Sequence, residues 1–171
     1  MVGDRHELDF DEFMRARWST LFRTAYLLAG SRHDAEDLLQ DALAKTCVRW
    51  RGIRDKRAAD AYVRRIMVHD AGRRWRRNRR ERSSAELPET VDDGGFGRRE
   101  THLDLWAQIQ TLPPRMRAVL VLRYYADLSE ADTARELGCS VGAVKSQAHH
   151  AIKRLRAALG DPAAAVLGSE S

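Results

Sequence analysis

The sequence has few of the features that support covalent or metal chemistry. Only two of its 171 residues are cysteines, Cys47 and Cys139, and neither has a second cysteine or a histidine at ligand spacing. This argues against a zinc site and a disulfide, and predicts two small buried thiols. The sequence also has no glycine-rich phosphate loop and no nucleophile paired with a base, and its six histidines are scattered. We therefore expect a protein that is not an enzyme and holds no metal or other cofactor.

Long apolar runs and lysine are also scarce. No run approaches the roughly 20 apolar residues of a membrane span, and the N-terminus lacks the basic-then-apolar order of a signal peptide. We therefore expect a cytoplasmic protein without a membrane partner. Arginine supplies most of the positive charge in a chain of net charge +5. Its planar fork suits contacts with phosphates and base edges, although an arginine-rich and alanine-rich composition also reflects a GC-rich genome.

A helix-turn-helix pattern occupies residues 128–159. Ser129 is placed to cap a first helix, Gly138 suits the left-handed conformation of a tight turn, and Ser140 is placed to cap a second helix. The branched Val144 can fill the angle between the two helices. A helix, a turn of about three residues and a second helix are the elements of this motif.

The two helices of this pattern differ in charge. Residues 127–137 hold four acids against one arginine, whereas residues 141–159 hold four basic residues, two histidines and no acid. A basic second helix is typical of a recognition helix that lies in the major groove of DNA. The alternative is an αα-hairpin in a helical bundle with a solvated charged face, because such patterns also occur outside DNA-binding proteins.

Two further helices are predicted before residue 50. Asp9 can open the first and Gly30 can end it, while Ser31 can cap the second. The second helix carries an apolar stripe that includes Cys47. The acids on its opposite face either favour the helix dipole or form a docking surface for a basic partner. This acidic face consists of Glu36, Asp37, Gln40 and Asp41.

A third helix is predicted from Ala59 or Asp60, and its apolar stripe fades along its length. Residues 64–82 hold nine arginines against two acids, a local net charge of +7, with Trp75 inside the run. Such a run can follow a phosphate backbone, and the tryptophan can either stack on an unpaired base or pack within its own domain. The alternative is a solvated helix end or an unstructured basic arm.

The composition changes after this basic run. Residues 83–97 contain serine, proline, paired glycines and acids without periodicity, which predicts a linker. A short helix around Trp106 should then end at Leu112, before a helix that begins at Pro114. The predicted fold is all-α, with two small helical domains joined by an acidic flexible linker. The predicted ranges are 1–82 for the first domain, 83–98 for the linker, 99–160 for the second domain and 161–171 for a tail.

In this order, the elements resemble the extracytoplasmic-function sigma factors of bacterial RNA polymerase. Residues 34–50 are similar to the family's region 2.2, which docks on the clamp helices of the polymerase β′ subunit. Residues 59–77 are similar to regions 2.3 and 2.4, which open and read the −10 promoter element. Residues 112–159 are similar to region 4, which binds the β flap and reads the −35 element. The composition resembles that of actinobacterial members.

The resemblance implies a role for three groups of residues. The polymerase-binding group is Glu36, Asp37, Gln40 and Asp41. The −10 group is Ile53, Arg54, Arg65, His69, Arg73, Arg76, Arg77 and Arg80. The −35 group is Lys145, Ser146, Gln147, His149, His150 and Lys153.

Some of these residues depart from the family's pattern. The loop around Ile53 and Arg54 corresponds to one that holds a base flipped from the −10 element. His69 stands where the family often has a base-contacting asparagine. Gln147 and His150 stand where many members have arginine, so an unusual −35 preference is expected.

The expected function is therefore that of a sigma factor. It would bind core RNA polymerase and promoter DNA and direct initiation at specific promoters, with an anti-sigma factor as a further candidate partner. One alternative is a stand-alone helix-turn-helix regulator, which explains residues 112–159 but leaves the basic helix and the acidic face without a role. Another is an interaction module, such as an RNA-binding helical protein or a decoy that sequesters polymerase.

Overall fold

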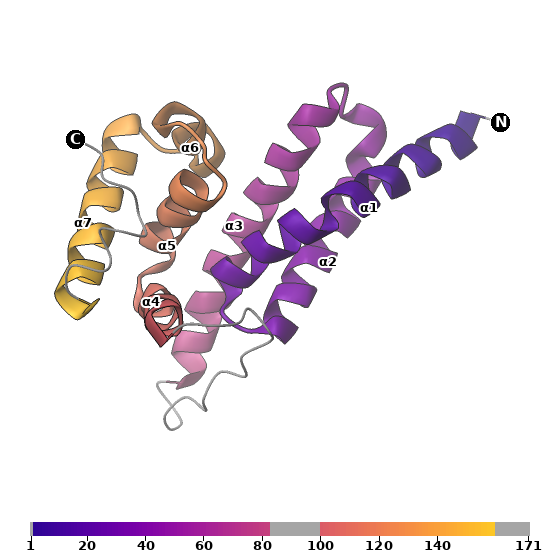
Figure 1. Cartoon of the computed structure of the whole chain (residues 1–171). Helices are drawn as coiled ribbons and strands as arrows, with labels where there is room; N and C mark the ends of the chain where they lie inside the picture. The colour runs from indigo at the N-terminus through magenta and orange to yellow at the C-terminus, as the bar shows by residue number, and fades with distance from the viewer. Residues whose placement is uncertain (1, 83–99, 160–171) are drawn as a thin grey trace. The chain divides into compact units, whose positions relative to one another are not determined.

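The computed structural model describes residues 2–82 and 100–159, which form helices joined by short turns (Figure 1). The predicted linker at 83–98 and the predicted tail at 161–171 lie outside these residues. The chain divides into two compact units, Met1–Arg74 and Trp75–Ser171. The all-α prediction is confirmed. No helix in the described part of the chain is both long enough and apolar enough to cross a lipid bilayer.

The first unit is built around three long helices. They are α1 (Val2–Ala29), α2 (Arg32–Arg49) and α3 (Lys56–Arg82), with the short 3-10 turn η1 (Trp50–Gly52) after α2. The unit boundary falls within α3, whose last turns from Trp75 belong to the second unit. The helices α2 and α3 run antiparallel and are connected at one end through η1 (Figure 1). This arrangement brings residues far apart in sequence into register across the two helices.

Local signals explain where these helices break. Gly30 has a φ of +94°, and the Ser31 side chain accepts a hydrogen bond from the Asp34 backbone N–H at 3.1 Å, so the predicted end and cap are confirmed. The prediction that α1 starts at Asp9 is wrong. The helix begins at Val2, because neither glycine nor proline interrupts residues 4–29.

The core of the first unit is aliphatic in the middle and aromatic at one end. Its most buried side chains include Leu38, Leu39 and Met67, each with no exposed surface. Together with Phe10 and Phe13 of α1, Trp50 closes the end next to η1. The ring centroid of Trp50 lies 5.1 Å from that of each phenylalanine.

The prediction of two buried cysteines is wrong for Cys47, which is exposed, while Cys139 is half-buried. Thr46, rather than Cys47, takes the inward position in that turn of α2. Its hydroxyl donates to the Ala42 carbonyl at 2.7 Å and is therefore satisfied inside the core. The following Val48 is 86% exposed. Cys47 follows Thr46 directly and therefore lies about 100° further round the helix, outside the buried face.

Besides the end of α3, the second unit contains the remaining elements and two apolar clusters. One cluster includes Leu120 and Leu155, and the other joins Val119, Ala134 and Val144. The fully buried Val144 therefore fills the angle between the helices of the motif, as predicted. The elements are α4 (Glu100–Thr111), α5 (Pro114–Leu120), the π-helical segment η2 (Val121–Tyr125), α6 (Glu130–Leu137) and α7 (Val141–Leu159).

The helix-turn-helix prediction is confirmed in its caps and its turn. Ser129 Oγ accepts from the Asp132 backbone N–H at 3.0 Å, and Ser140 Oγ accepts from the Ala143 backbone N–H at 3.1 Å. Gly138 ends α6 in the left-handed conformation with a φ of +63°. These local interactions fix where α7 starts and which side of it packs inward.

Candidate nucleic-acid and partner interfaces

The predicted polymerase-binding residues lie on one side of α2, and three of them already contact basic side chains of the same chain. Gln40 and Asp41 are exposed, whereas Glu36 and Asp37 are half-buried. The contacts are Arg32 Nε to Glu36 Oε1 at 3.0 Å, His33 Nε2 to Asp37 Oδ2 at 3.5 Å and Arg74 Nη2 to Asp41 Oδ2 at 2.6 Å. The sequence indicated the acidic face but not these partners.

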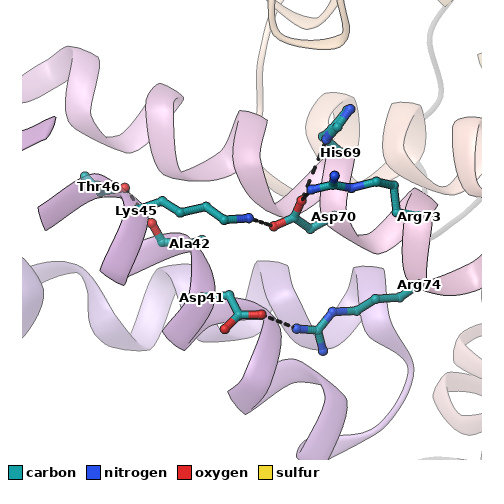
Figure 2. A network of polar contacts seen from close by, with 8 residues as sticks. All are labelled: Asp41, Ala42, Lys45, Thr46, His69, Asp70, Arg73 and Arg74. Atoms are coloured by element: carbon teal, nitrogen blue, oxygen red, sulfur yellow. Dashed lines mark hydrogen bonds and ion pairs between the residues drawn. The ribbon is translucent and has the colours of Figure 1, made fainter. Parts of the chain in front are cut away.

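A polar seam runs between α2 and α3. Arg74 of α3 reaches across to Asp41 of α2, and Lys45 of α2 reaches across to Asp70 of α3 with an Nζ to Oδ2 distance of 2.5 Å (Figure 2). Both contacts follow from the antiparallel arrangement of the two helices. Lys45 lies four residues after Asp41 on α2, and its partner Asp70 lies four residues before Arg74 on α3. The sequence analysis missed Lys45 and Arg74. The sequence feature that could have indicated this contact is Lys45 itself, a lone lysine one helical turn after Asp41.

Asp70 is the centre of this seam. Its side chain is only 7% exposed, and its other oxygen accepts from Arg73 Nη2 at 2.5 Å, while His69 Nδ1 lies 3.7 Å away. Burial pushes the pKa of this carboxyl up, but hydrogen bonds and charges from Lys45 and Arg73 outweigh burial and leave the pKa below its ordinary value. The carboxylate is therefore charged at neutral pH. Its contribution to stability is lost as the pH falls through the lowered pKa.

The predicted −10 residues of α3 share one property, which is exposure to solvent. This holds for both the arginines and the histidine of the group, whereas Met67 and Asp70, which lie between them in sequence, are buried. The exposed set is Arg65, His69, Arg73, Arg76, Arg77 and Arg80. Trp75 is half-buried, and the Arg79 guanidinium carbon lies 5.2 Å from the centre of its ring.

The loop predicted to hold a flipped base follows directly on η1. The Ile53 backbone N–H donates to the Trp50 carbonyl at 3.1 Å, and Trp50 itself is anchored between the two phenylalanines of α1. Ile53 is half-buried and Arg54 is exposed. The aromatic anchor therefore positions a short segment whose side chains remain accessible.

The exposed residues of α7 lie opposite its buried row. Val144, Ala151 and Leu155 face the core, while most of the predicted −35 residues face solvent. Gln147 differs because it is half-buried at the edge of the exposed face. The exposed set is Lys145, Ser146, His149, His150 and Lys153. Lys145 Nζ lies 3.6 Å from Glu130 Oε2 of α6, and the ring centroids of His149 and His150 are 5.8 Å apart.

Arg117 stabilises the break between α4 and α5, just before this motif. The sequence did not indicate this role. In a continuous helix the Gln110 carbonyl would accept from the N–H of residue 114, but Pro114 has none. Arg117 Nη2 donates to this carbonyl at 2.6 Å and to that of Leu112 at 3.1 Å. Burial lowers the pKa of the Arg117 guanidinium to about 10, so the group stays charged at neutral pH.

These features define a helical DNA-binding protein with a basic helix in one unit and a helix-turn-helix in the other. A family model described as Sigma-70 region 2 matches residues 14–81, and one described as Sigma-70, region 4 matches residues 102–155. The chain belongs to the extracytoplasmic-function (ECF) sigma factors of bacterial RNA polymerase.

Individual relatives agree with this assignment. The RNA polymerase sigma-E factor of Streptomyces coelicolor is 42% identical over 150 residues, which cover 87% of this chain and 85% of that protein. The ECF RNA polymerase sigma factor SigM of Mycobacterium tuberculosis is 32% identical over 161 residues, covering 94% of this chain and 81% of that protein. The solved structure of the sigma factor RpoE in complex with the anti-sigma factor NepR from Bartonella quintana has the same fold. Its TM-score is 0.75 at 22% identity, and the match covers 90% of this chain and 98% of that chain.

Proposed function

We propose that this sigma factor binds core RNA polymerase through the acidic face of α2 and reads promoter DNA through two separate surfaces. The loop after η1 and the exposed side of α3 would bind the −10 element, and the exposed side of α7 would bind the −35 element. The polymerase would carry out the chemistry, because sigma factors are non-catalytic initiation factors. A cytoplasmic location and an anti-sigma partner belong to the same proposal.

The observation that carries this proposal is the exposure of the arginines along α3. A helix that needed them only for packing would bury their stems and pair their charges, whereas Arg76, Arg77 and Arg80 are exposed over successive turns. We propose that the −10 module extends to residue 82 and the −35 module covers residues 99–160. The family matches at residues 14–81 and 102–155 support these limits.

Run-off transcription with core RNA polymerase purified from Streptomyces coelicolor would test the function as a whole. Adding the chain to a pool of genomic promoters should produce transcripts from a subset that shares two spaced elements. Tight binding to duplex DNA without polymerase would instead favour a stand-alone regulator. Binding to polymerase without promoter-specific transcripts would favour a sequestering decoy.

Reversing the charge of Asp37 should weaken binding to core polymerase. Asp37 lies on the acidic face and contacts His33, whereas reversing Asp41 would also disturb Arg74. We expect Asp37→Lys to raise the dissociation constant on the order of tenfold, because an attractive contact becomes a repulsive one. Asp11→Lys, the same charge change at an exposed position of α1, is the control. Equal affinities for the two variants would rule out this face.

Removing the Gln147 side chain should alter which bases are preferred in the −35 element. A glutamine can pair with N6 and N7 of adenine, and losing such a pair costs about 1–3 kcal/mol of discrimination at one position. Lys153→Ala, an exposed change on the same helix, should weaken binding to all sequences alike. Selection from a randomised −35 library measures both effects. An unchanged consensus for Gln147→Ala would show that this residue does not read bases.

A further inference from the structure

We propose that Lys45, Arg73 and His69, grouped around the Asp70 carboxylate, form a binding site for one backbone phosphate of promoter DNA. The site would extend the −10 surface from α3 onto α2 and would give Lys45 a role in binding DNA. This inference rests on the proposed function, because it adds a contact to the same DNA surface. The four side chains and their contacts are drawn in Figure 2.

The first argument is the distribution of exposure within the cluster. The Asp70 side chain is 7% exposed, whereas those of Lys45, Arg73 and His69 are 50%, 56% and 70% exposed. The anion is thus at the bottom of the cluster and the basic groups are at its rim. An external anion would meet the basic groups and not the carboxylate.

The second argument is charge balance. Lys45 and Arg73 carry two positive charges against the single negative charge of Asp70, so the cluster has a surplus of +1 before His69 is counted. A phosphodiester carries one negative charge and would make the cluster neutral. Two other ion pairs between helices of this unit are each balanced, because Arg17 pairs with Asp60 and Arg74 pairs with Asp41.

The third argument is geometry. A lysine ammonium has three N–H donors and an arginine guanidinium has five, so hydrogen bonds to Asp70 use only part of this capacity. Asp70 also reduces the repulsion between the two cations and restricts their side chains before any ligand binds. Fixing donors in advance lowers the entropy cost of binding.

The test uses reconstituted holoenzyme and a promoter fork with a single-stranded −10 region. Lys45→Gln keeps a hydrogen-bond donor for Asp70 but removes the surplus charge. We expect its affinity for the fork to fall about tenfold, the scale of one charge-assisted hydrogen bond. The slope of log affinity against log salt should shrink by about 0.7, the value for one single-strand phosphate. Arg17→Gln removes the cation of a balanced pair and should leave that slope unchanged.

A second measurement identifies the phosphate itself. A series of forks carries one neutral methylphosphonate linkage each, moved stepwise through the −10 region. At one linkage the wild-type holoenzyme should lose about tenfold in affinity, while the Lys45→Gln holoenzyme should lose nothing further. This comparison does not depend on whether the substitution changes the stability of the fold.

The outcomes separate this site from the function on which it rests. If wild-type holoenzyme opens promoters but Lys45→Gln keeps the wild-type salt slope and remains sensitive to every linkage, the phosphate site is refuted. Lys45 then only joins α2 to α3. If wild-type holoenzyme fails to bind the fork at all, the proposed function fails first.

Discussion

Replacing Arg117 by alanine should destabilise the helix-turn-helix unit by about 3 kcal/mol, because the change leaves the carbonyls of Gln110 and Leu112 without their buried donor. A hydrogen bond to a charged group contributes about 1.5–3 kcal/mol, and Arg117 donates two. Hydrogen exchange of the α5 and α7 amides in the full chain would measure the loss. Arg115→Ala, an exposed change in the same helix, should cost less than about 0.5 kcal/mol.

Replacing Arg117 by alanine removes both its hydrogen bonds and its side-chain volume, and Arg117→Met separates these two effects. Methionine fills much of the same space but donates no hydrogen bond, so it should be nearly as destabilising as alanine if the carbonyls matter most. Burial of the guanidinium has its own cost, as the lowered pKa of Arg117 indicates, and apolar replacements of buried charges are sometimes stabilising. A methionine variant as stable as the wild type would contradict our explanation.

The second large effect is expected on α3. Replacing Arg76, Arg77 and Arg80 by alanine together should reduce the salt slope of promoter binding by holoenzyme by about 2, since each single-strand phosphate contact contributes about 0.7. Open-complex formation should fall on all promoters by similar factors, because phosphate contacts carry no sequence information. Filter binding over a range of salt concentrations measures the slope, and transcription from several promoters measures the uniformity.

Exposed arginines elsewhere provide the control for this triple variant. Arg15 and Arg23 of α1 are also exposed, and replacing both by alanine removes positive charge from a different helix. Their variant should keep the wild-type salt slope. If the α3 triple variant keeps that slope as well, the arginines are a solvated helix face and the −10 surface must lie elsewhere.

Features with a local cause were the ones that the sequence predicted well. The caps at Ser31 and Ser129, the break at Gly30 and the start of α5 at Pro114 each depend on a residue and its near neighbours. The start of α1 was placed too late, because a good capping residue such as Asp9 can also lie inside a longer helix. The π-helical segment η2 was not predicted, since nothing in its composition marks it.

The contacts that organise the candidate sites depend instead on tertiary structure. The Lys45 to Asp70 pair spans 25 residues and exists only once α2 and α3 lie antiparallel. The role of Arg117 likewise depends on the folded structure. Pro114 has no N–H to donate to the Gln110 carbonyl, and only the fold shows that Arg117 donates to this carbonyl instead. The sequence therefore indicated which residues are chemically suited to the interfaces, but not which of them hold each other in place.

The separation of buried and exposed positions on α7 has a consequence for how promoter choice changes over time. Val144, Ala151 and Leu155 secure the helix, while residues such as Ser146 and His149 face outward. Exposed substitutions usually change stability by no more than about 0.5 kcal/mol, so the outward row is nearly free of folding constraints. If α7 reads the −35 element as proposed, duplicated copies of such a gene can diverge toward separate promoter sets by substitutions at these positions, while one scaffold is retained.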